Sequence, residues 1–135
     1  MYLVDTNIFL EILLVQRKRE KAKAFLGCSD RLELFITDYS LHSVGVILLK
    51  RGQHEKFTDF VDDMILNAGL TEVSLPVEDL LEVSEMAGRF GLDFDDAYQY
   101  VAAGQNDLEI VSFDSDFDAT DLGRLRPAEV LERLK

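Results

Sequence analysis

Short apolar segments alternate with longer helical patterns along the whole chain, and this alternation constrains the fold most. Strand-like composition occurs in residues 2–4, 32–37, 71–75 and 108–113. Apolar residues at helical spacing occur in residues 8–14, 38–50, 54–66, 77–90 and 94–105. Strands that alternate with helices return to one sheet through crossovers, so they run parallel. The sequence therefore predicts an α/β fold, a three-layer sandwich with a mainly parallel central sheet.

Capping residues mark the ends of several of these segments. Asp5 is suited to cap the helix after the first strand, and Asp38 or Ser40 the helix after the second. Gly91 is suited to end one helix and Asp93 to begin the next. A basic segment leads into a further helix that ends near residue 27, whereas the tail over 127–134 is compatible with a short strand or a helix.

Length and composition favour one globular domain over residues 1–135. The chain is 47% hydrophobic, enough for an adequate core. No apolar run approaches the roughly 20 residues that span a bilayer, and no basic signal-peptide start precedes the first strand. The single cysteine, Cys28, excludes an internal disulfide. We expect a cytoplasmic protein without membrane contact.

The net charge of −12 argues against general electrostatic binding of nucleic acid, which depends on positive surface. The charge is unevenly distributed, however. Residues 17–56 contain nine Lys and Arg against five acids, while residues 57–121 contain 17 acids and one basic residue, Arg89. Solvated helix faces account for such runs. A basic flank that faces an acidic, metal-loaded crevice is the functional alternative.

Aspartates follow two of the predicted strands and open one helix. Asp5 follows the first strand, Asp114 and Asp116 follow the last, and Asp96 lies in the first turn of the helix over 94–105. Because parallel strands end at one edge of the sheet, these carboxylates can converge on one crevice. Such a cluster repels itself unless a cation or a proton compensates it. A hard divalent metal is the expected cation, and phosphate-ester chemistry the expected reaction.

The aspartates have separate expected roles. Asp93 is the expected helix cap, Asp96 the expected site residue, and Asp95 is open between the two. If the chain stays extended after residue 113, Asp114 and Asp116 project to similar sides. Asn7 either orients Asp5 or binds a substrate phosphate. The neighbouring Glu11 shares the helix face of Asn7 and is either exposed or part of the site.

Three motifs in order resemble a PIN domain: Leu3-Val4-Asp5-Thr6-Asn7, then Asp95-Asp96-Ala97-Tyr98, then Ser112-Phe113-Asp114-Ser115-Asp116. The resemblance covers essentially the whole chain and implies a metal-dependent ribonuclease, with toxin components of toxin–antitoxin pairs among the relatives. It also implies Mg²⁺ or Mn²⁺ as cofactor, RNA as substrate, an antitoxin as inhibitor, and compatibility with a homodimer. The residues that match the metal-site acids of the family are Asp5, Asp96, Asp114 and the frequent fourth acid, Asp116.

The chain departs from the family pattern in the helix after its second strand. The family usually has a glutamate there, and Ser43 occupies the corresponding position. His42 is adjacent but faces about 100 degrees away on an ideal helix. The loss of one carboxylate should weaken metal binding and remove a second ion, unless Glu11 or Asp95 compensates.

The leading hypothesis is hydrolysis of RNA phosphodiester bonds at a metal held by the four matching aspartates. Basic residues that could guide the RNA backbone are Arg17, Lys18, Arg19 and Lys21. The first alternative is a catalytically weakened PIN-like module that binds RNA or protein, which Ser43 favours. The second is a metal-dependent phosphatase or phosphotransfer domain, for which Thr37 is present but the downstream lysine arrangement is not evident.

Overall fold

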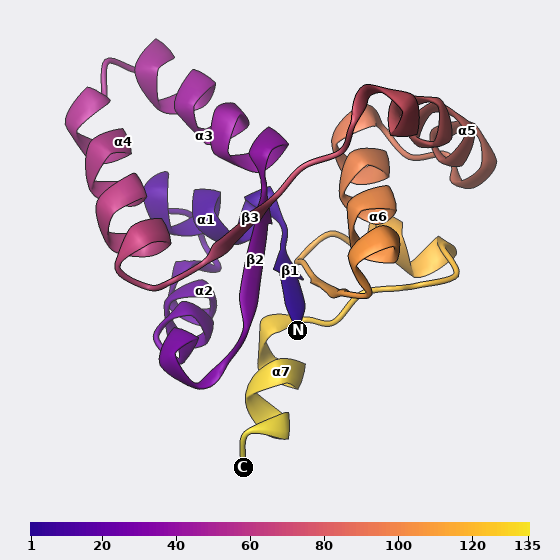
Figure 1. Cartoon of the computed structure of the whole chain (residues 1–135). Helices are drawn as coiled ribbons and strands as arrows, with labels where there is room; N and C mark the ends of the chain where they lie inside the picture. The colour runs from indigo at the N-terminus through magenta and orange to yellow at the C-terminus, as the bar shows by residue number, and fades with distance from the viewer.

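The computed structural model describes residues 1–135 and has a four-stranded sheet at its centre (Figure 1). The strands are β1 (Tyr2–Val4), β2 (Leu34–Thr37), β3 (Thr71–Val73) and β4 (Glu109–Val111). Their order across the sheet is β3-β2-β1-β4, and each neighbouring pair is parallel. The predicted α/β fold with a parallel central sheet is confirmed.

Helices cover both faces of the sheet (Figure 1). One face carries α1 (Thr6–Leu13), α2 (Arg19–Leu26), α3 (Asp38–Lys50) and α4 (His54–Asp59), and α7 (Pro127–Arg133) packs against α2. The other face carries α5 (Leu80–Phe90) and α6 (Phe94–Asn106). Short 3-10 turns are η1 (Ser29–Arg31), η3 (Val77–Asp79) and η4 (Ser115–Ala119), and η2 (Phe60–Leu66) is a π-helix that follows α4. None of the helices is long and apolar enough to cross a membrane.

The alternating side chains of the strands divide the core into two layers. Val4 packs in the cluster beneath α1 to α4, and Leu3 in the cluster beneath α5 and α6. On β2, Ile36 faces the first layer and Phe35 the second. The sheet is therefore mainly buried on both faces at β1, β2 and β4, whereas the edge strand β3 is largely exposed, and the sandwich has three layers.

Several element ends differ from the sequence-based expectation. The last strand ends at Val111, two residues earlier than expected, because the chain then turns away from the sheet. Leu125 forms an isolated parallel bridge with Val111, and its N–H donates to the Ile110 carbonyl at 2.7 Å. The helix expected over 54–66 changes after α4 into the π-helical η2. The tail, which the sequence left open, forms helix α7, with Pro127 in its first turn.

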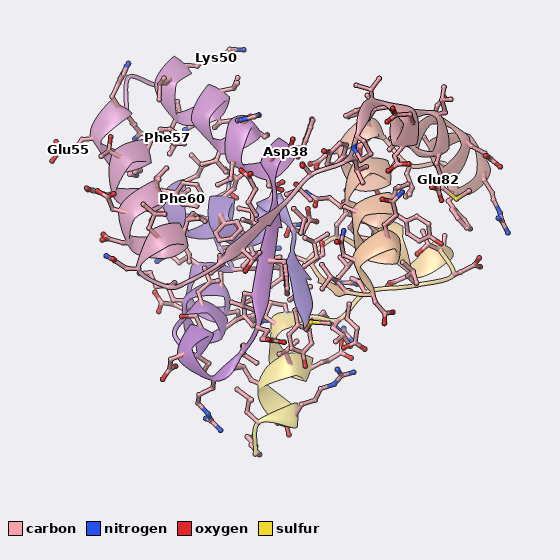
Figure 2. The ribbon with its side chains drawn as sticks, viewed as in Figure 1. Asp38, Lys50, Glu55, Phe57, Phe60 and Glu82 are labelled. Carbon is pink, nitrogen blue, oxygen red and sulfur yellow. The ribbon has the colours of Figure 1, made fainter.

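The expected cap of α3 was wrong. Neither Asp38 nor Ser40 caps this helix; the hydroxyl of Thr37 accepts the Ser40 N–H at 3.0 Å. Ser40 is fully buried and Asp38 lies in the first turn, at the C-terminal end of β2 (Figure 2). Because Thr37 takes the capping role, the Ser40 hydroxyl is free to face the interior.

The order of the strands reverses direction at β1. The chain adds β2 and then β3 on one side of β1, and afterwards adds β4 on the other. The connecting helices change face at the same point, from α1 to α4 on one face to α5 and α6 on the other (Figure 1). In open α/β sheets, sites form at the C-terminal ends of the strands where the order reverses. Asp5 follows β1 there, and Asp114 comes soon after β4.

A glycine turn joins α5 to α6 and sets the position of the aspartates that follow. Gly91 has φ of 68°, in the left-handed region, and ends α5. Two residues later, Asp93 caps α6 by accepting the Asp96 N–H at 2.9 Å, as the sequence predicts. The turn therefore determines where the first turn of α6 lies.

Alanine substitutions at two glycines should have opposite effects on stability. Gly91→Ala should lower the free energy of unfolding by about 1 to 2 kcal/mol, because the left-handed region is unfavourable for a residue with a Cβ. Gly88→Ala should raise it by about 0.5 to 1 kcal/mol, because Gly88 is exposed within α5 and a Cβ there meets nothing within 4 Å. Urea denaturation of both variants measures the difference, and equal effects would contradict the assignment of the turn.

Candidate functional site

Five aspartates gather at the C-terminal edge of the sheet. Carboxylate oxygens of Asp5, Asp95 and Asp96 lie within 4.8 Å of one another, as do those of Asp96, Asp114 and Asp116. Asp96 belongs to both groups. We call the first group the inner triad and the second the outer triad. The structure thus brings together the four acids expected from sequence and adds Asp95, whose role the sequence left open.

Asp5 is held rigidly at the end of β1. It is 3% exposed; one of its carboxylate oxygens accepts the Thr6 N–H at 2.7 Å and the other accepts the Ser112 hydroxyl at 2.6 Å. Burial raises the pKa of Asp5 to about 7, an effect that the hydrogen bond from Ser112 opposes. Asp5 therefore caps α1 and faces the other carboxylates at the same time.

Ser112 links three parts of the site and was not singled out from sequence. Its hydroxyl donates to Asp5 and accepts from the Asn7 side chain at 3.1 Å and from the Asp114 N–H at 2.8 Å. The side-chain oxygen of Asn7 in turn accepts the Phe113 N–H at 3.4 Å. Asn7 therefore orients the loop after β4, and it reaches Asp5 only through the Ser112 hydroxyl.

Asp96 lies at the centre of the cluster and has an unsatisfied oxygen. It is 4% exposed, and its Oδ2 atom is buried without a hydrogen-bond partner. Burial, and then the charges of Asp114 and Asp5, raise the pKa of Asp96 to about 8. An unpaired buried carboxylate oxygen is costly unless a ligand satisfies it. Asp96 is thus prepared to receive a proton or a cation.

Asp95 is held by a buried polar network beneath the inner triad. Gln99, one helical turn along α6, donates its amide to Asp95 at 3.3 Å, to the Ser40 hydroxyl at 2.5 Å and to the Thr6 hydroxyl at 3.3 Å. Burial raises the pKa of Asp95, and the Gln99 hydrogen bond opposes that rise. The sequence signal was a glutamine in the apolar run of α6, four residues after Asp95.

The loop that carries Asp114 and Asp116 is a turn and not an extended strand. Asp114 accepts the Asp116 N–H at 2.8 Å and begins η4. Arg124 stabilises this loop with two contacts. Its guanidinium donates to the Ser112 carbonyl at 3.1 Å and forms a salt bridge with Asp118, also at 3.1 Å. The chain therefore does not stay extended after residue 113, because an aspartate after a strand readily closes a local turn.

This donor set suits Mg²⁺ or Mn²⁺. Both ions prefer oxygen ligands, and the inner and outer triads supply carboxylate oxygens at close range. The Oδ2 atom of Asp96 has no hydrogen-bond partner, and a bound cation would satisfy it. The residues present therefore fit a divalent metal.

Of the four basic residues expected near the site, Lys18 is the one that the structure links to it. Its Nζ atom lies 5.0 Å from the centroid of the Phe113 ring, next to the loop that carries Asp114. Arg19 donates to the Gln16 carbonyl at 3.1 Å and lies 3.9 Å from Glu20. The two remaining residues, Arg17 and Lys21, are exposed.

The helix α3 brings no carboxylate to either triad. Ser43 lines a neighbouring pocket of about 470 Å³. The tilted rings of Tyr39, Phe94 and Tyr98 also line it. The α3 residue that reaches the network beneath the inner triad is Ser40, one turn earlier. Glu11 also lies outside both triads, although one of its oxygens is buried without a partner.

The raised pKa of Asp96 predicts a pH-dependent stability difference in the metal-free protein. Between the ordinary pKa of 3.8 and about 8, folded Asp96 keeps a proton that the unfolded chain releases, so stability falls as pH rises. Asp96→Asn is neutral throughout. The melting temperature of Asp96→Asn should match that of the natural chain near pH 3.5 and exceed it at pH 8. For a chain of this size, each 1 kcal/mol of difference in the free energy of unfolding shifts the melting temperature by about 4 °C.

Thermal denaturation across this pH range in a chelator measures the difference. Mg²⁺ should then raise the melting temperature of the natural chain at pH 8 and leave that of Asp96→Asn nearly unchanged. A difference between the two proteins that does not vary with pH would contradict the burial of an ionisable Asp96.

Solved structures share this fold. VapC20 of Mycobacterium tuberculosis, a toxin that cleaves the sarcin-ricin loop, matches with a TM-score of 0.77 at 18% identity, over 94% of this chain and 100% of that chain. A chain of a toxin–antitoxin complex from Klebsiella pneumoniae matches with a TM-score of 0.70 at 20% identity, over 94% and 98%. FitAcB from Neisseria gonorrhoeae matches with a TM-score of 0.69 at 21% identity, over 95% and 99%.

A comparison with curated protein sequences finds no significant match. The family model of the PIN domain, however, matches residues 2–122. That range includes β1 to β4 and all five aspartates of the two triads. The chain therefore belongs to the PIN domain family.

Proposed function

We propose that this protein is a metal-dependent endoribonuclease. The observation that carries the proposal is the buried, unpartnered oxygen of Asp96 at the point where the inner and outer triads meet. Membership of the PIN domain family, whose members are generally nucleases, supports the same reaction class. RNA as the substrate, and Mg²⁺ or Mn²⁺ as the cofactor, are parts of this proposal.

Each aspartate has a distinct part in the proposed site. Asp5 and Asp96, both buried, hold their carboxylates at the base of the site, and the outer Asp114 and Asp116 lie nearer to solvent. Ser112 fixes the relative position of Asp5 and Asp114. A divalent cation bound there would lower the pKa of a water molecule and offset the charge that develops on a phosphate ester.

The substrate must approach against a strongly negative protein. The net charge of −12 repels a phosphate backbone unless the site is loaded with metal and local basic residues assist. Lys18, beside Phe113, is the basic residue we assign to phosphate contact. Cleavage should therefore depend on the cation for binding as well as for chemistry.

A toxin-type role is also part of the proposal. Proteins of the same fold include a toxin and a chain of a toxin–antitoxin complex. We infer that a protein inhibitor of the antitoxin type restrains this chain in the cell. Induced expression should then arrest bacterial growth, and expression of Asp96→Asn should not.

The main alternative is a PIN-like module that binds RNA or protein without efficient cleavage. Ser43 favours it, because α3 supplies no acid to the site. If Ser43→Glu greatly increased cleavage, this alternative would gain support. The phosphotransfer alternative is weaker, because Thr37 is fully buried and its hydroxyl caps α3.

Asp96→Asn should abolish metal-dependent cleavage of a mixed RNA pool while the fold is retained. The change removes the charge shared by both triads and keeps the shape of the side chain. We expect a loss of rate of about a hundredfold or more, comparable to the loss of one electrostatic contact to a transition state.

The matched control is Asp59→Asn, which removes an exposed aspartate at the end of α4 that belongs to neither triad. It should cleave as the natural chain does, and a chelator should stop both. Equal rates for Asp96→Asn and Asp59→Asn would contradict the assigned site.

Lys18→Gln should raise the KM for RNA about fivefold and leave kcat within about twofold, because it removes a phosphate contact and not a catalytic group. The dependence of log KM on log salt concentration should fall in slope by about 1. Lys50→Gln, at the far end of α3 (Figure 2), is the control and should change neither quantity. An unchanged KM for Lys18→Gln would remove Lys18 from the proposed site.

A further inference from the structure

We propose that Asp95 is a ligand of the cation at the inner triad, and that Gln99 is the residue that positions it. The inference rests on the proposed metal-dependent function and extends it to two residues of α6. The carboxylate of Asp95 lies within 4.8 Å of those of Asp5 and Asp96, so it can share a cation with them.

Two features beyond the clustering of acids indicate a ligand at this position. Asp96, which is 4% exposed and belongs to both triads, has a buried Oδ2 atom without a hydrogen-bond partner. The amide of the fully buried Gln99 is oriented with its N–H groups toward Asp95, Ser40 and Thr6, while its own Oε1 atom has no partner. The fold therefore leaves one buried oxygen at the cluster, and a second beside it, without partners.

The orientation of the Gln99 amide places an N–H donor, and not the amide oxygen, against the Asp95 carboxylate. If the amide were reversed, its oxygen would face the Asp95 carboxylate and repel it. An unpaired buried acceptor costs about 1 to 3 kcal/mol, so this orientation is maintained at the expense of Oε1. Gln99 thus fixes which way Asp95 faces while donating only a neutral hydrogen bond.

The location of Asp95 gives it a role that no other element fills. Asp5 directly follows β1, and α6 supplies Asp95 and Asp96. The loop after β4 supplies Asp114 and Asp116. α3 packs beside them but contributes the Ser40 hydroxyl and no carboxylate. Without Asp95, a cation at the inner triad would have only the carboxylates of Asp5 and Asp96 as ligands. Both oxygens of Asp5 already accept hydrogen bonds.

Mn²⁺ binding measured by calorimetry tests the role of Asp95 without reference to activity. Asp95→Asn removes the charge and keeps an oxygen that can accept from Gln99. We expect it to weaken Mn²⁺ binding about tenfold or more. Its control is Asp93→Asn, which removes the same charge from the same turn; Asn caps α6 equally well, and Asp93 belongs to neither triad.

Asp93→Asn should change the Mn²⁺ affinity by less than about threefold, because it alters only the surrounding field. Equal losses in the two variants would show that charge alone matters and would overturn the role of Asp95, while the proposed function would stand. If the natural chain bound no Mn²⁺, the proposed function would fail and this inference with it.

Gln99→Met tests the positioning role. Met has a similar length and no polar amide, so it removes the hydrogen bond to Asp95 and also the unpaired Oε1. We expect Mn²⁺ affinity to fall about tenfold in the natural background and to fall no further when Asp95 is already Asn. An equal additional loss in the Asp95→Asn background would overturn the action of Gln99 through Asp95.

Discussion

The parallel pairing of β1 with β4 is the contact on which the site depends. The register joins Val4 to Val111, and the Asp5 N–H donates to the Val111 carbonyl at 3.0 Å. This pairing brings the Ser112 hydroxyl within 2.6 Å of Asp5, a residue 107 positions away. Because β1 is also the strand at which the order of the sheet reverses, its C-terminal end lies between helices that cover opposite faces (Figure 1). The carboxylates meet there.

The same arrangement has an electrostatic cost. Burial and mutual repulsion favour the protonated forms of Asp5 and Asp96. The fold offsets part of this cost with donors from Thr6 and Ser112, and with the positive end of α6. It leaves the Oδ2 atom of Asp96 unsatisfied. Folded proteins retain such local costs mainly at functional sites, where a ligand offsets them.

Much of the fold could be predicted from sequence because its signals are local. The strand at residues 2–4, the helix after Asp93 and the turn at Gly91 each depend on neighbours within a few residues. The errors arose where two local solutions competed. Thr37 and its neighbours all suit a helix cap, and the backbone geometry at the end of β2 selected Thr37. Similarly, Asp114 closed a turn where an extended chain was also compatible with the sequence.

The sequence was sufficient for the alternation of strands and helices, the parallel sheet and the convergence of acids at the strand ends, because periodicity and strand direction imply them. It identified Asp93 as the cap of α6 and Asp96 as a site residue, but it left the role of Asp95 between them open. That role depends on the rotation of α6 against β1 and α3, which packing across the sheet sets. The support from Gln99, Ser112 and Arg124 has the same origin, because each of these side chains reaches a residue on another element. Hydrogen bonds between distant segments follow from the packed register, and one stretch of sequence contains only one of the two partners.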